Sequence, residues 1–105
     1  MKLWIDDVRP APEGYVWVKS VNEAIDFIDV LGVSDEYFDL PTTLVDMDHD
    51  AGDFAYDGGD YIKFLDYCEE TWGKDLPFDI HIHSMNPVGV QNMRVIIRKN
   101  GWAEV

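Results

Sequence analysis

The stretch KLWIDD (residues 2–7) decides the fold of this chain, because it is a short apolar run that ends abruptly in two acids. Its first five residues have the composition of a β-strand. The next segment, residues 8–14, holds two prolines and a glycine and is predicted to be a loop. The chain therefore begins with a strand whose carboxyl end is acidic.

Strands and helices alternate along the rest of the sequence. The predicted elements are further strands at residues 15–19, 42–47 and 78–83, and helices at about 21–31, 60–72 and 87–100. Gly32 is predicted to cap the first helix, and an acidic, aromatic connector at residues 35–40 follows it. Alternation of this kind favours a parallel sheet with right-handed crossovers. We therefore predict a single three-layer α/β domain over residues 1–105 with a mostly parallel sheet.

Length and composition fit one folded domain. The chain has 105 residues, of which 47% are hydrophobic and 13% aromatic. Its net charge of -13 argues against binding of duplex nucleic acid or of an anionic membrane through a basic face. The single cysteine, Cys68, is expected in the core, and the sequence has no recognisable signal peptide or membrane-spanning run. We expect a soluble, cytoplasmic protein.

Acids gather where predicted strands end. Asp6 and Asp7 follow the first strand, and Asp48 follows the strand at 42–47. The carboxyl ends of parallel strands share one edge of a sheet, so these carboxylates are expected to repel one another unless a cation lies among them. Oxygen ligands suit Mg²⁺ or Mn²⁺. The alternative is that these acids only form turns at the strand ends.

A third strand end carries groups that suit phosphate chemistry. His83, Ser84 and Asn86 join the strand at 78–83 to a helix that begins at Pro87. The first N–H groups of that helix, with the Ser84 and Asn86 side chains, can meet a phosphate, and the His83 imidazole can transfer a proton. The alternative is a core histidine beside a residue that only caps the helix.

Two further residues are candidates with equally good alternatives. His49 lies between two acids and can transfer a proton, or it can be a solvated loop histidine. Arg9 can bind a phosphate with its planar guanidinium, or it can neutralise the neighbouring acids. His81 is expected to be a packed histidine deeper in the sheet.

Four motifs together resemble the cyclic-phosphate processing receiver domains, in the right order and over nearly the whole chain. They are KLWIDDVRP (2–10), DHD (48–50), GGDY (58–61) and IHSMNP (82–87). The resemblance implies a receiver-like, flavodoxin-like fold in which Asp6 and Asp7 match the metal-binding acids and Asp48 matches the phosphoacceptor position. It also implies that His83, Ser84 and Asn86 belong to the family signature.

The resemblance implies action on cyclic phosphates that arise in RNA repair or ADP-ribose metabolism. The chain differs from an ordinary receiver in having a loop in place of the first crossover helix and no lysine after a late strand, which argues against phosphorylation signalling. At most a short edge strand is expected near the C-terminus. We expect Mg²⁺- or Mn²⁺-dependent hydrolysis of a cyclic phosphate on a nucleotide, an RNA end or an ADP-ribose derivative. The alternative is an inactive binding module with an acidic interaction face.

Overall fold

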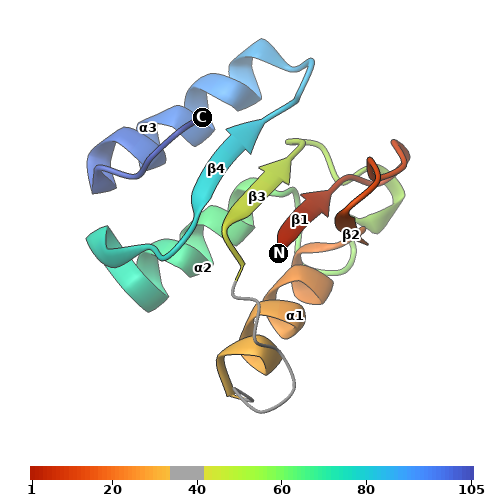
Figure 1. Ribbon diagram of the computed structural model, residues 1–105. Coiled ribbons are helices and arrows are strands. Elements are labelled where there is room, and N and C mark those ends of the chain that lie inside the picture. The colour runs from red at the N-terminus through yellow and green to blue at the C-terminus, as the bar shows by residue number, and fades with distance from the viewer. Residues whose placement is uncertain (34–41) are drawn as a thin grey trace.

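A parallel sheet of four strands forms the centre of the molecule (Figure 1). The computed structural model describes residues 1–33 and 42–105. The strands are β1 (Lys2–Ile5), β2 (Tyr15–Val18), β3 (Leu44–Met47) and β4 (Asp79–Ile82). They lie in the order β2-β1-β3-β4, and each neighbouring pair is parallel. The predicted α/β receiver-like fold is therefore confirmed, with a loop in place of a helix between β1 and β2.

Helices follow each of the strands except β1. They are α1 (Val21–Val33), α2 (Ile62–Trp72) and α3 (Pro87–Asn100), with 3₁₀ turns η1 (Gly52–Phe54) and η2 (Gly73–Asp75). Asn86 caps α3 by accepting a hydrogen bond from the Gly89 N–H at 3.0 Å. The predicted cap at Gly32 is wrong, because α1 continues through this residue to Val33. The predicted connector at 35–40 lies outside the described residues.

The hydrophobic core lies on one face of the sheet. Alternate strand residues point towards the helices, and Leu3, Val45 and Ile80 among them are fully buried. Helix α2 contacts both α1 and α3, so all three helices share this face. The part of the chain that the structure describes therefore has two layers, where three were expected, because loop 6–14 takes the place of a helix on the opposite face.

The opposite face of the sheet carries aromatic and charged side chains. Trp4 in β1 is in register with Trp17 in β2 and Asp46 in β3, and Asp46 is in register with His81 in β4. Neighbours in register point to the same side of a parallel sheet. The sheet thus separates an apolar core from a polar, aromatic face, and the carboxyl ends of its strands open towards that face.

The C-terminal segment confirms the predicted short edge strand. Glu104 forms a single parallel bridge with Ile80, which is the remnant of an edge strand. Trp102 is buried, and its Nε1 donates to the Gly73 carbonyl at 2.6 Å, so it covers the ends of α2 and α3.

Cys68 is fully buried, and burial raises the pKa of its thiol. Among the described residues, none of the helices has the length and apolar character needed to cross a membrane.

Candidate functional site at the carboxyl edge of the sheet

A partly buried histidine lies between two buried carboxylates at this edge. His83 follows β4; its Nε2 is 2.8 Å from Oδ2 of Asp6, which follows β1. Its Nδ1 is 2.5 Å from Oδ1 of Asp46 in β3. Asp6 and Asp46 expose only 1% and 7% of their surface. A buried carboxylate is costly without a partner, so the imidazole and the two acids stabilise one another.

The indole ring of Trp4 forms one wall of this cluster. The Trp4 and His83 rings are stacked, with centroids 3.9 Å apart and planes 5° from parallel. Trp4 exposes 7% of its surface, and its other ring contact is an edge-on packing against Tyr15. The stacked indole removes water from one side of the imidazole, which strengthens the electrostatic interactions that His83 makes.

Asp6 also organises the loop that replaces the missing helix. Its Oδ1 accepts the backbone N–H groups of Val8 and Arg9 at 3.0 and 2.9 Å, which leaves Oδ2 for His83. Trp4 Nε1 donates to the Arg9 carbonyl at 2.8 Å, which holds the loop beside the ring stack. Burial by itself raises the pKa of Asp6, but these N–H groups and the His83 imidazole outweigh it and lower the pKa below its usual value. Asp6 is therefore ionised.

The same contacts favour a protonated His83. Burial opposes the charge on the imidazole, but the carboxylates of Asp46 and Asp6 outweigh burial and raise the pKa of His83 above its usual value. A protonated imidazole would balance part of the negative charge of the acidic cluster. It can donate a proton from Nε2 only if a new acceptor takes the place of Asp6.

Asp48 completes a group with the spacing of metal ligands. It follows β3, and its backbone N–H donates to the Ile5 carbonyl at 2.9 Å, which places it beside the end of β1. One ligand atom each from Asp6, Asp48 and His83 lie within 4.8 Å of one another. The topology has therefore brought three strand ends together, as the sequence predicts.

Asp7 borders the same group from the side of η1. Its Oδ2 lies so close to Gly52 that a Cβ at this glycine would overlap it, and Gly52 also has a φ of +54°. Burial raises the pKa of Asp7, and the negative charges of Asp6 and Asp48 add to this effect. Asp7 therefore interacts electrostatically with both other acids. Its part in holding a metal stays a prediction.

His49 and Asn86 both contact the carboxylate of Asp50, at the edge of the site. His49 Nδ1 is 2.9 Å from Asp50 Oδ1, and the Asn86 amide donates to the same carboxylate at 3.3 Å. Gly89, in the first turn of α3, packs directly against the His49 imidazole, and a Cβ there would overlap the ring. His49 is only 14% exposed, so it is a packed histidine and not a freely solvated one. His49, Asp50 and Asp60 also have ligand atoms within 4.8 Å of one another.

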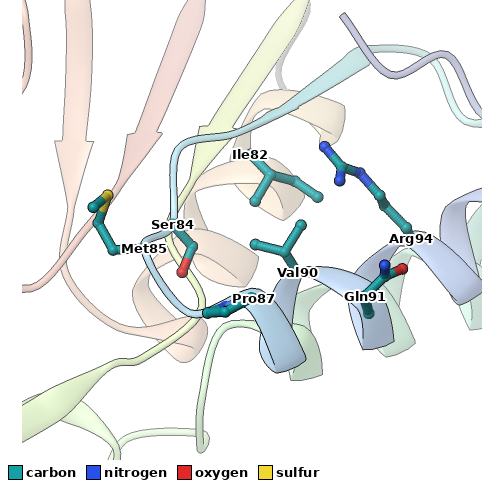
Figure 2. A pocket seen from close by; sticks show the side chains of 7 residues that line it. All are labelled: Ile82, Ser84, Met85, Pro87, Val90, Gln91 and Arg94. Atoms are coloured by element: carbon teal, nitrogen blue, oxygen red, sulfur yellow. The ribbon is translucent and has the colours of Figure 1, made fainter.

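Neither Ser84 nor Arg9 has a described side-chain contact with the cluster. Ser84 accepts the Asn86 N–H at 3.1 Å and lines a groove of about 440 Å³ between β4 and α3 (Figure 2). Val90 and Arg94 line the same groove from α3. Arg9 is exposed, and the contacts described for it are made by its backbone. The substrate-binding roles predicted for Arg9 and Asn86, and the catalytic role predicted for Ser84, are not tested by this geometry.

Asp46 and Trp4 are site residues that the sequence analysis did not identify. A signal was present in the third strand, whose sequence LVDM places one charge inside an apolar run at a position that alternates with buried Val45 and Met47. A charge there indicates a partner on the opposite face of the sheet. Trp4 occupies the equivalent position in β1.

The donor set fits a divalent cation. Asp6 and Asp48 offer carboxylate oxygens, which Mg²⁺ and Mn²⁺ prefer, and Asp7 borders them. Asp6 is almost fully buried and ionised, and the raised pKa of Asp7 reflects its burial and, in addition, repulsion by Asp6 and Asp48, which a cation would relieve.

Comparison with protein families matches residues 1–99 to the cyclic-phosphate processing receiver domain. Comparisons with curated proteins and with solved structures gave no match. The family match covers both ends of the site, from the β1 acids to the turn that carries His83, and it agrees with the fold and with the order of the four motifs. The chain therefore belongs to the cyclic-phosphate processing receiver domain family.

Proposed function

We propose that this domain hydrolyses a cyclic phosphate carried by a nucleotide, an RNA end or an ADP-ribose derivative. The observation that carries the proposal is the His83 imidazole, held between buried carboxylates with its Nε2 directed at the acidic edge of the sheet. A protonated imidazole beside a cluster of acids suits a reaction in which a leaving oxygen must gain a proton. The family description supports the substrate class.

We propose that Asp6, Asp7 and Asp48 hold Mg²⁺ or Mn²⁺, which when bound would polarise the phosphoryl group and lower the pKa of a water. Side chains of the protein transfer the proton and bind the phosphoryl oxygens. His83 Nε2 donates its proton to the ester oxygen that leaves as the ring opens, while a water oxygen forms the new bond to phosphorus. Asn86, Ser84 and Arg9 are the proposed contacts of the phosphoryl oxygens, and His49 is the alternative proton-transfer group.

The test is hydrolysis of 2',3'-cyclic nucleotides and of an ADP-ribose cyclic phosphate, with Mg²⁺, Mn²⁺ or EDTA present. His83→Ala should lose about 100-fold or more of kcat, because a positioned general acid contributes on this scale. His81→Ala is a matched control, since His81 contacts the Val105 carbonyl and not the acids. No turnover by the wild type, or equal turnover by His83→Ala, would disprove the proposal.

The proposed partners are small phosphorylated ligands, and the proposed location is the cytoplasm, which cell fractionation tests. The alternative function, an inactive module that binds a partner through its acidic face, predicts neither turnover nor a defined metal site. Fluorescence of Trp4 discriminates between the two, because its ring stacks on His83 beside the acids and should respond to metal binding. Trp4→Phe identifies how much of the signal comes from this tryptophan.

A further inference from the structure

We propose that Asp46 is a positioning residue that fixes the orientation and the tautomer of His83; this rests on the proposed function, in which His83 donates a proton. Asp46 touches neither the ester oxygen nor a reacting atom in that scheme. Its Oδ1 instead lies 2.5 Å from His83 Nδ1, on the side of the ring away from Asp6. Asp46 thus acts on the chemistry through the imidazole.

The position of Asp46 in the sheet has no other explanation among the described contacts. The residue is central in β3, in register with Trp4 on one side and His81 on the other, and it is 7% exposed. A buried carboxylate in the middle of a strand is less favourable than an apolar residue unless a polar partner compensates it. His83 is the hydrogen-bond partner that the structure gives to the Asp46 side chain.

The two nitrogens of His83 therefore have different tasks. Asp46 Oδ1 lies 2.5 Å from Nδ1 and accepts the Nδ1–H, so this contact favours the neutral tautomer with hydrogen on Nδ1. Nε2 faces Asp6 Oδ2 at 2.8 Å, on the side of the acidic cluster, and it is the atom that donates the proton in the proposed function. The ring cannot rotate out of this arrangement freely, because Trp4 is stacked on its face at 3.9 Å.

In the proposed hydrolysis, the bond between water oxygen and phosphorus forms, and the bond between phosphorus and the ester oxygen breaks. The ester oxygen takes the proton from Nε2, and the imidazole becomes the neutral form with hydrogen on Nδ1. The water loses its proton to solvent or to a carboxylate of the site, and Nε2 is later reprotonated from solvent. Asp46 accepts the Nδ1–H both in the imidazolium before transfer and in the neutral imidazole after it, so the ring does not have to reorganise.

The experiment compares Asp46→Asn with Asp79→Asn. Asp79 is exposed in the neighbouring strand β4, so its variant removes the same charge without touching His83. The first measurement is the ¹⁵N NMR spectrum of the imidazole in metal-free protein, which reports the tautomer without any turnover. Because Asp6 competes for hydrogen at Nε2, the test is a comparison: we expect a larger share of the Nδ1–H tautomer in the neutral ring of the wild type and of Asp79→Asn than in Asp46→Asn.

The second measurement is the split between kcat and KM. Asp46→Asn should lose about 100-fold of kcat with little change in KM, as expected when the partner that orients a histidine is removed. The double variant Asp46→Asn/His83→Ala should be no slower than His83→Ala, because Asp46 acts only through the ring. An unchanged tautomer in Asp46→Asn, or a kcat equal to that of Asp79→Asn, overturns the positioning role.

The two hypotheses fail in distinguishable ways. If wild type hydrolyses no cyclic phosphate, the proposed function is wrong, and the tautomer comparison still decides whether Asp46 positions His83. If Asp46→Asn does not fold, the wild type supplies the test. Its Nδ1-bound hydrogen should then exchange with solvent more slowly than the hydrogen on Nε2, and the reverse order overturns the role of Asp46.

Discussion

Replacing Asp7 by asparagine should stabilise the metal-free protein and weaken its response to metal. The negative charges of Asp6 and Asp48 help burial to raise the pKa of Asp7, so the folded state disfavours the Asp7 charge at neutral pH. Removing that charge should raise the free energy of unfolding by about 0.5–1 kcal/mol, the range of partly solvent-screened charge interactions. At roughly 4–8 °C per kcal/mol for a domain of this size, the melting temperature should rise by about 2–8 °C.

Saturating metal should reverse this order. At a metal concentration of 100 times Kd, the wild type gains about 2.7 kcal/mol, and a variant that binds tenfold more weakly gains about 1.4 kcal/mol. Thermal melts followed by circular dichroism, with EDTA or with Mg²⁺ or Mn²⁺, measure both effects. Asp75→Asn is the control, because it removes an exposed charge in η2. A less stable metal-free Asp7→Asn protein would refute the argument from charge repulsion. A full metal response in this variant would refute the assignment of Asp7 as a ligand.

Three other predictions address the rim, the surface and the core. Gly89→Ala should displace His49, because the added Cβ would overlap the imidazole ring. Turnover that depends on His49 should then fall, while the metal-induced rise in melting temperature stays. Unchanged turnover would exclude His49 as the proton-transfer group. Burial, with the nearby Asp29 carboxylate, raises the pKa of Tyr67 to about 12. Ultraviolet titration should show this value, and the stabilisation from the raised pKa should be complete below about pH 10 and lost as the pH rises through 12. Phe64→Ala, at a fully buried position, should cost about 3–5 kcal/mol in urea unfolding.

The sequence was sufficient to predict where the site lies. Asp6 and Asp48 follow strands that a parallel topology brings together. His83 follows a third strand that ends at the same edge of the sheet. These inferences needed only local patterns and the crossover rule. The layer count was wrong, because predicting helices does not show which face of a sheet they cover.

The partners of His83 could not be predicted in the same way. Asp46 is 37 residues before His83 and Asp6 is 77 residues before it. Their contacts depend on the register of β1, β3 and β4, and a shift of one residue would turn Asp46 into the core. Trp4 presents the same difficulty, because its stacking on His83 depends on the side chain's direction and not on composition.

The loop between β1 and β2 and the histidine at the end of β4 together suggest how this site differs from that of a signalling receiver. The loop uses one oxygen of Asp6 for its own N–H groups, so the other oxygen is left to hold His83. Strand β4 carries no lysine, and the basic side chain that contacts the acids is the His83 imidazole. A lysine amine, with an ordinary pKa of about 10.4, keeps its proton at neutral pH, whereas an imidazole, at about 6.5, can exchange it. An exchangeable proton beside the acids would suit the proposed hydrolysis of an ester, in which a leaving oxygen gains a proton.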